Sequence, residues 1–513
     1  MSFAKATREP GSITGQAIWM VIAKGIALVL ALALPLILVR WLSTEQMGLY
    51  RQAFQILSTA LALLGLQVAA SVYYFTPREP ERKGLVVLNV LVFYLTVGTI
   101  VALLFVVSPH WVVPILNGDA LVPNVPLLGV TILLWLVGLN LECVAIANKD
   151  IRWSSVATVL IQLLKTSLLI AAAVIGKSIR AMLIAALLIG VIHCSVHLYY
   201  IWSRMGSFWR GFDLKLFKAQ LASALPFGIG SLAYVIQFDL HHYYVSSHFT
   251  PEEFAIYSIG CFQLPILQVL IDGVETVLLP EIARLENDGA YKRIFQVWAG
   301  AMRMLAFAFF PICVMLFVLR REFILTLFTA TYEAATPIFA VNLFNLLLYV
   351  LLTGALLRAL PDLKYFRIKF CLVQLPITFF VLYAGIKLGG MVGVIAAVAV
   401  TRVLDAGVTM VAIGRRLSLT WQDLKHLGPL GRLALASLIA AVVTIVAKLA
   451  MTGWPVQATL AVGTLIYGAV YLAALFAAGA VTPEEKSWLL TRWQKLRRFG
   501  SAPIGISTVP KAQ

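Results

Sequence analysis

Three cations inside apolar stretches are the residues of this chain best suited to chemistry. Lys24, Lys165 and Arg303 are each surrounded by mostly apolar sequence, and none has an acidic residue three or four positions away. A charge at the centre of a membrane span costs about 2.5 to 3.5 kcal/mol on insertion scales, so such a residue faces protein or water. Charged donors in a poorly hydrated cavity bind anions strongly. We therefore predict that these three cations bind an anionic ligand, although extension to the interface or pairing with another helix would also satisfy each one.

Acidic residues within apolar stretches form a second set with a different capacity. Carboxylates at membrane depth can take up protons or Na⁺ and couple an ion gradient to a conformational change. Asp239 is the most suggestive member, because His241 and His242 follow it two and three positions later. Asp272 and Glu275 could instead pair with Arg284 or Arg303 and close an inner gate. The predicted coupling or gate residues are Asp239, Glu142, Asp272 and Glu275.

Other polar patterns argue against metal binding and against familiar catalysis. Adjacent histidines such as His241 and His242 point to different faces of a helix, and no Glu or Cys completes a closed site, so no metal is expected. Arg402 and Asp405 lie three positions apart, and we expect them to neutralise each other on one helical face. The sequence has no Walker A loop, HExxH helix or GxSxG turn, so we predict neither a cofactor nor an enzyme.

The elements that carry these residues are membrane-spanning helices. A hydrocarbon core of about 30 Å needs about 20 helical residues, and apolar stretches of that length fill nearly the whole chain. The composition agrees, with 61% hydrophobic and 12% charged residues. We predict an all-α polytopic membrane protein with about fourteen transmembrane helices. The expected spans are 17–39, 52–74, 85–108, 122–147, 154–176, 181–203, 219–246, 254–279, 297–319, 335–357, 366–386, 391–413, 432–451 and 456–479.

The distribution of positive charge predicts how the chain is oriented. The net charge is +17, and most of the 40 Lys and Arg residues lie in the tails and in the even-numbered connections. This asymmetry is typical of cytoplasmic loops, so we place both termini in the cytoplasm and exclude nucleic acid as a partner. The segment 484–499 mixes aromatic and basic residues and suits an amphipathic helix on the cytoplasmic leaflet, or a plain solvated tail.

An internal repeat predicts how the spans are organised. The segment 42–50 aligns with 249–257 at a constant offset of 207, matching Glu45 with Glu252 and Tyr50 with Tyr257. Six spans lie between the copies, and an even number preserves orientation, so the halves should be parallel repeats. We predict an N-terminal six-helix lobe (1–205), a C-terminal six-helix lobe (206–416), transmembrane helices 13 and 14 (417–480) and a basic cytoplasmic tail (481–513).

These segments also resemble a known family. The sequence 39–50, its repeat ending at Tyr257, and the segment 331–337 are similar to those of the polysaccharide transporter family. That family includes the O-antigen and exopolysaccharide flippases of the multidrug/oligosaccharidyl-lipid/polysaccharide exporter superfamily. The resemblance implies two lobes that open alternately to each side of the membrane. It also implies transport of an undecaprenyl-diphosphate-linked oligosaccharide, whose diphosphate would be the anion held by Lys24, Lys165 and Arg303.

The resemblance sets the expected role and leaves alternatives open. It implies a flippase of the bacterial inner membrane that works in cell-surface polysaccharide synthesis, with the lipid-linked oligosaccharide and membrane lipids as partners. H⁺ or Na⁺ as coupling ion, and a polysaccharide polymerase as partner, stay open. The alternatives are a multidrug or metabolite exporter of the same superfamily and a membrane glycosyltransferase or O-antigen ligase.

Overall fold

The structure consists of long helices, and this confirms the predicted all-α polytopic fold. The computed structural model describes residues 13–111, 120–205, 211–420 and 422–479, and these ranges contain no strand. Ten helices within them are long and apolar enough to cross a membrane, or up to twelve if each of two bent helix pairs is one span. The tail predicted at 481–513 lies outside the described residues.

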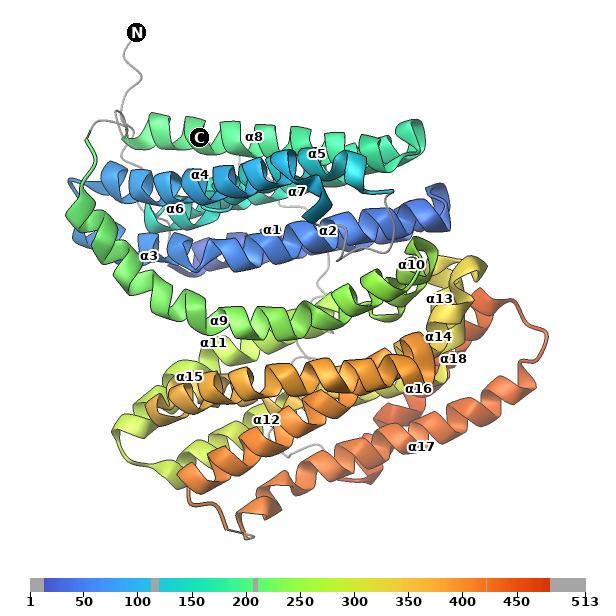
Figure 1. Cartoon of the computed structure of the whole chain (residues 1–513). Coiled ribbons are helices and arrows are strands. Elements are labelled where there is room, and N and C mark those ends of the chain that lie inside the picture. Colours follow the sequence, from blue (N-terminus) through green and yellow to red (C-terminus); the bar gives the residue numbers. More distant parts are fainter. Residues whose placement is uncertain (1–12, 112–119, 206–210, 421, 480–513) are drawn as a thin grey trace, which may run out of the picture.

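The first half of the chain forms one layer of packed helices, seen in the upper part of Figure 1. We call this layer the N-terminal lobe. Within it α4 packs against α5, α1 against α7, and α5 against α8. Its helices are α1 (Ile13–Trp41), α2 (Thr44–Gly65), α3 (Ser71–Arg78), α4 (Lys83–Val107), α5 (Val125–Gly138), α6 (Leu141–Ala147), α7 (Ile151–Ala171) and α8 (Ile179–Met205).

The second half forms the lower layer in Figure 1, which we call the C-terminal lobe. Helices α17 (Gly428–Ala450) and α18 (Val456–Ala477) follow it, and α17 packs against α12. Lys448 of α17 pairs with the buried Glu322 of α13 at 2.9 Å, which fixes α17 to the lobe. The helices of the lobe are α9 (Leu214–His248), α10 (Pro251–Gly260), α11 (Pro265–Asn287), α12 (Tyr291–Val318), α13 (Arg320–Phe328), α14 (Thr336–Leu347), α15 (Thr353–Ala359) and α16 (Pro361–Arg416).

Helix α16 folds back on itself at Gly389 and Gly390. Gly390 has φ 54° and ψ −136°, a conformation that glycine adopts far more readily than other residues. Gly385 and Gly393 then face each other so closely that a Cβ on either would clash with the backbone of the other. The two arms therefore correspond to the predicted spans 366–386 and 391–413. The total of fourteen spans stays a prediction.

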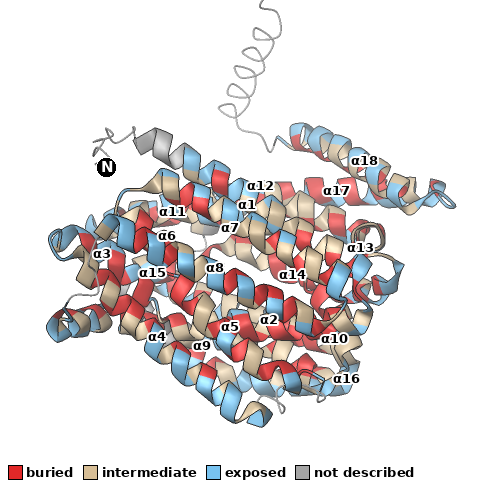
Figure 2. Cartoon of the chain, turned by 90° about the horizontal axis from the view of Figure 1, so that it is seen from above, coloured by how far each residue is buried: buried red, intermediate tan, exposed pale blue. Residues whose placement is uncertain are grey.

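Burial differs between the helices in a way that locates the interior. Half of the residues are buried in the most apolar windows of Val122–Ala147 and Ala330–Ala359, against 17% for Trp19–Trp41. Figure 2 shows buried residues gathered around α2, α5, α10 and α14, and exposed residues over α18. The spans that contain α5 and α14 are therefore among the most buried, whereas α1 has largely exposed sides.

The two copies of the sequence repeat begin helices in the same manner. Ser43 caps α2 and Thr250 caps α10, each in a capping box whose third helical residue, Gln46 or Glu253, bonds back to the cap. These two helices contact each other across the lobes. We call this end of the molecule the outer end and the opposite end the inner end, after the predicted orientation.

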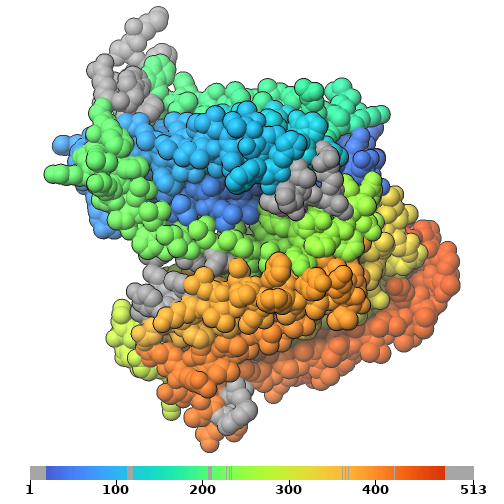
Figure 3. Space-filling model, in the orientation of Figure 1, coloured from blue at the N-terminus to red at the C-terminus, as the bar shows by residue number. Residues whose placement is uncertain are grey.

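Helix α9 belongs to both lobes. Its first turns lie on the N-terminal lobe, where Gln220 accepts a bond from Asn89 at 2.8 Å and donates to Ser71 at 3.3 Å. Its later turns pack against α2 and α16. Figure 3 shows α9 (green) running along the boundary between the lobes.

Candidate functional site

Lys24 and Glu142, predicted to have separate roles, form an ion pair. Nζ of Lys24 on α1 lies 3.1 Å from Oε1 of Glu142 on α6. Their side chains are 59% and 40% exposed, although both lie within segments apolar enough to span a membrane, Trp19–Trp41 and Val122–Ala147. The pair belongs to the inner half of the N-terminal lobe.

Lys165 points to an aromatic ring inside the N-terminal lobe. Its Nζ lies 4.8 Å from the ring centroid of Trp135, a cation–π contact between α7 and α5. The Trp135 indole donates to the carbonyl of Ala186 on α8, so three helices enclose the cation. In the described part of the chain no carboxylate forms an ion pair with Lys165.

Arg303 lies on α12 and is half-buried in the C-terminal lobe. The three predicted cations therefore come from α1, α7 and α12, two in one lobe and one in the other. A shared ligand for all three stays a prediction.

The carboxylates of α11 have partners other than those expected. Glu275 pairs with Arg358 of α15, and Asp272 accepts a hydrogen bond from Gln268 at 2.9 Å. Arg284 pairs with Glu281 of its own helix at 2.6 Å. The alternative pairing of Asp272 and Glu275 with Arg284 is therefore wrong. The nearer carboxylate of Glu281 takes that guanidinium instead.

The expected pair of Arg402 and Asp405 does not form either. Asp405 pairs with Arg367 on the facing arm of α16. Arg402 donates to the hydroxyl of Tyr349 at 2.9 Å and lies 5.2 Å from the Phe238 ring centroid. The fold of α16 presents a second helix to Asp405, and a single helical face could not reveal that partner.

Asp239 lies at the boundary between the lobes. The hydroxyl of Thr59 on α2 donates to Oδ2 of Asp239 on α9 at 2.5 Å, and Gln55 in turn donates to Thr59 at 3.2 Å. Tyr243, one turn after Asp239, donates to the backbone carbonyl of Gln55 at 3.4 Å. These bonds join α2 to α9.

A group of aromatic and basic side chains continues this boundary toward the outer end. His241 Nδ1 lies 2.7 Å from the Tyr257 hydroxyl of α10, and the rings of His241 and His242 are 4.1 Å apart. Nε and Nη2 of Arg51 on α2 are buried and have no hydrogen-bond partner within the described ranges. Buried guanidinium atoms without partners are costly, which makes Arg51 a candidate functional residue.

Arg51 was missed because the second span was expected to begin at residue 52. Hydropathy alone sets that boundary, and it leaves Arg51 outside the predicted span. The cap at Ser43 starts the helix eight residues earlier than expected, at Thr44. The S-T-E-Q pattern at 43–46 is a capping-box signal that could have placed Arg51 within the helix.

The described residues contain no group of three or more His, Cys, Asp or Glu arranged to hold a metal ion.

Comparison with known proteins identifies the family of the chain. A family model described as polysaccharide biosynthesis protein matches residues 78–337, which is half of the chain. No curated protein matches the sequence.

Solved structures of low sequence identity share the fold. The lipid II flippase MurJ in an inward closed conformation matches with a TM-score of 0.63 and 15% identity, over 89% of this chain and 98% of that one. An inward-facing multidrug resistance MATE family transporter of the MOP superfamily matches with a TM-score of 0.58 and 15% identity, over 79% and 98%. A MOP superfamily transporter from Pyrococcus furiosus matches with a TM-score of 0.55 and 14% identity, over 80% and 97%. These likenesses establish the fold that the resemblance implied.

Proposed function

The chain belongs to the polysaccharide biosynthesis protein family, and on that premise we propose that it is a flippase for a lipid-linked oligosaccharide. The substrate is an undecaprenyl-diphosphate-linked oligosaccharide, which moves from the cytoplasmic to the outer leaflet for cell-surface polysaccharide synthesis, such as that of O-antigen or exopolysaccharide. The protein lies in the bacterial inner membrane with both termini in the cytoplasm. One structural neighbour is itself named as a flippase, for lipid II.

The observation that carries this proposal is the exposed ion pair of Lys24 and Glu142. A charged pair in a membrane span is costly when it faces lipid. Side chains that are 59% and 40% exposed there are best satisfied by water in a vestibule that opens toward the inner end. Exposed Arg358 with Glu275 supplies a second such pair, from the opposite lobe.

Lys24 is suited to hold the diphosphate because its present partner is exchangeable. Glu142 neutralises Lys24 while the vestibule is empty. A diphosphate carries more charge and more acceptor atoms than one carboxylate, so it competes for the ammonium group. Release of Glu142 changes the contact between α1 and α6, and the polyprenyl tail stays in the lipid. Lys165 and Arg303 are proposed as further cations for the same headgroup.

Asp239 is proposed as the coupling residue. It accepts a bond from Thr59 across the lobes, so protonation or binding of Na⁺ at its carboxylate would weaken or redirect that bond. The lobes would then rock, and the headgroup would pass to the other side without any covalent bond being made or broken. Asp272 and Glu275 are proposed gate residues at the inner end, held by Gln268 and Arg358.

The test is a leaflet-resolved assay of lipid-linked oligosaccharide with protein variants. We expect depletion of the chain to cause accumulation on the cytoplasmic face. Lys24→Gln should reduce transport about ten-fold, while Glu142→Gln should leave Lys24 available and reduce it less. Lys165→Gln and Arg303→Gln test the other two cations. Lys218→Gln, an exposed lysine at the start of α9, is the matched control.

Other outcomes would identify the alternatives. Accumulation on the outer face would indicate a ligase or polymerase. Unchanged glycolipid with hypersensitivity to drugs would indicate an exporter, a reading that the MATE neighbours favour. Full transport by the Lys24, Lys165 and Arg303 variants at normal protein levels would rule out the cation site.

A further inference from the structure

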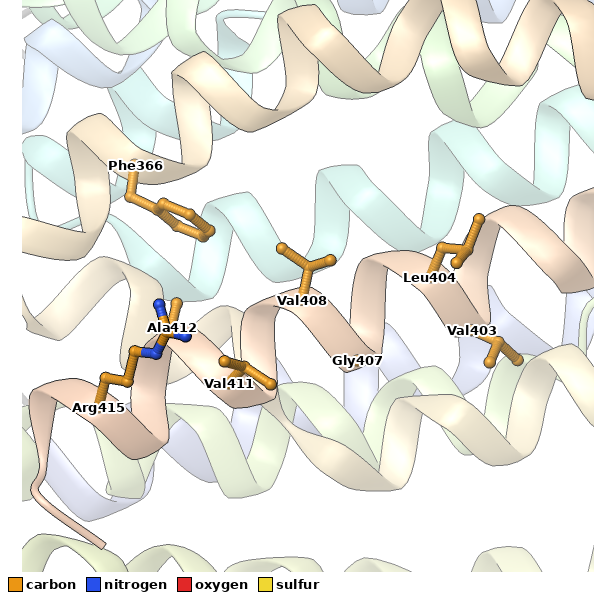
Figure 4. Close-up of a pocket in the computed structure, with 8 residues that line it drawn as sticks. All are labelled: Phe366, Val403, Leu404, Gly407, Val408, Val411, Ala412 and Arg415. Atoms are coloured by element: carbon orange, nitrogen blue, oxygen red, sulfur yellow. The ribbon is translucent and has the colours of Figure 1, made fainter.

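An open apolar groove runs along the second arm of α16 near the inner end. The groove has a volume of about 390 Å³ and is lined by Phe366 of the first arm and by a stripe of the second arm. Figure 4 shows Phe366 pointing across the groove toward the stripe, and the side chain of Arg415 at one end, running back toward Ala412. The stripe consists of Val403, Leu404, Gly407, Val408 and Val411.

The groove follows from how the arms are held together. At the turn, Gly385 and Gly393 bring the two backbones into contact. Further along, Gln374 donates to the carbonyl of Thr401 at 3.0 Å, and Arg367 pairs with Asp405. These contacts use one face of the second arm. The stripe lies on another face, where Val403, Leu404 and Val411 are about half exposed.

Arg415 gives the groove a charged end. Its neighbour Arg416 is paired with Glu286 at 2.7 Å and with Asp362 at 2.9 Å. Arg415 itself is exposed, and no carboxylate of the described ranges forms an ion pair with it. A cation at the end of a membrane helix, next to an apolar groove, matches the layout of an anionic lipid, with its charge at the interface and its chain in the bilayer.

We propose that this groove binds one anionic glycerophospholipid of the inner-end leaflet, with an acyl chain along the stripe and the phosphate on Arg415. The length supports this occupant. From Val403 to Arg415 the helix rises about 18 Å, which is close to one leaflet of a hydrocarbon core of about 30 Å. An acyl chain crosses one leaflet, whereas a long polyprenyl chain extends well beyond such a groove. The site is independent of the proposed flippase activity.

Gly407 allows a clean test of the groove. A Cβ built on Gly407 meets nothing within 4 Å, so Gly407→Leu extends into the groove without a clash. Gly414, on the same arm but outside the groove, is equally open, and Gly414→Leu is the matched control. Arg415→Gln tests the charge, with Arg432→Gln on α17 as its control. The full-length chain would be placed in nanodiscs of mixed phosphatidylglycerol and phosphatidylcholine. Native mass spectrometry of the protein released from them would count the lipids that stay bound.

We expect the unchanged chain to retain one phosphatidylglycerol in preference to phosphatidylcholine. Arg415→Gln should reduce that preference about five-fold, and Gly407→Leu should remove the retained lipid whatever its headgroup. Both controls should behave like the unchanged chain. Equal retention in all variants would overturn the site. Preferential retention of added undecaprenyl phosphate would also overturn it, because the groove would then hold the carrier lipid. Thermal melting of each variant checks that the fold is intact.

Discussion

Helices α2 and α10 begin alike and then diverge. Both start at a capping box and contact each other at the outer end, and each is followed by a bend of 49°. At the repeat offset of 207, three polar residues of α2 correspond in sequence to apolar or small residues of the second copy. The matched pairs are Arg51 with Ser258, Gln55 with Phe262, and Thr59 with Ile266. The shared part sets where the helices meet. The bonds to Asp239 and from Tyr243 of α9 involve the N-terminal copy, whereas the C-terminal copy contacts α9 through Tyr257 and His241.

The largest effect is expected where the two helices touch. A Cβ on Gly48 would lie 1.8 Å from the carbonyl oxygen of Pro251, so Gly48→Ala must separate the helices. We expect transport to fall more than about ten-fold and the melting temperature to drop, measured by the leaflet assay and circular dichroism.

The matched control is the repeat counterpart of Gly48. Ala255 is fully buried, and Ala255→Gly removes a methyl group without creating a clash, at a cost of about 1 kcal/mol. If Gly48→Ala transports as well as Ala255→Gly does, contact between these helices is not needed for the transport cycle.

A substitution at Arg51 is expected to change stability and transport in opposite directions. Arg51→Gln removes buried guanidinium atoms without hydrogen-bond partners, so the free energy of unfolding should rise by about 1 to 3 kcal/mol. Transport should fall, because Arg51 stands beside the lobe boundary. Arg320→Gln is the control, because Arg320 is an outer-end arginine at the start of α13 that donates to the carbonyl of Phe317 in the last turn of α12. A loss of both stability and transport would identify Arg51 as a structural residue.

The two caps should be nearly equivalent. Ser43→Ala and Thr250→Ala each remove a side-chain oxygen that accepts a backbone N–H, and each should cost about 1 kcal/mol of stability. Denaturant unfolding of the two variants compares them directly. A clear loss of stability in only one variant would mean that the two caps contribute unequally to the free energy of unfolding.

The smallest effect is expected at a cap that can titrate. Asp213 at the start of α9 accepts backbone N–H groups of Leu216 and Lys215 and a bond from Arg82, and these hold its pKa below the ordinary value of 3.8. A lowered folded-state pKa gives stability that is present above the unfolded-state pKa and is lost as pH falls through the folded-state pKa. The protection factors of the amides in the first turn of α9, corrected for the intrinsic exchange rate at each pH, should therefore fall in acid. The turn capped by Ser43 should not show this response, because its capping-box partner is the amide of Gln46.

Much of the fold follows from local patterns in the sequence. Hydropathy located the helices, the glycine pair at 389–390 fell between two expected spans, and the repeat marked two helices that contact each other. Pairings between distant helices, such as Arg367 with Asp405 and Arg358 with Glu275, depend on tertiary placement that one sequence does not encode locally. Arg51 is an intermediate case. The capping-box pattern at Ser43 places Arg51 within α2, but hydropathy alone starts the span after this residue.

Helix α9 rests on the first lobe through Gln220 and on the second through its packing against α16. The non-covalent contacts between the two lobes therefore do not require a covalent connection between residues 205 and 211. A gene divided at that point would yield two fragments, and the second would carry a ready-made docking helix for the first. The same fold would then be assembled from two separate chains.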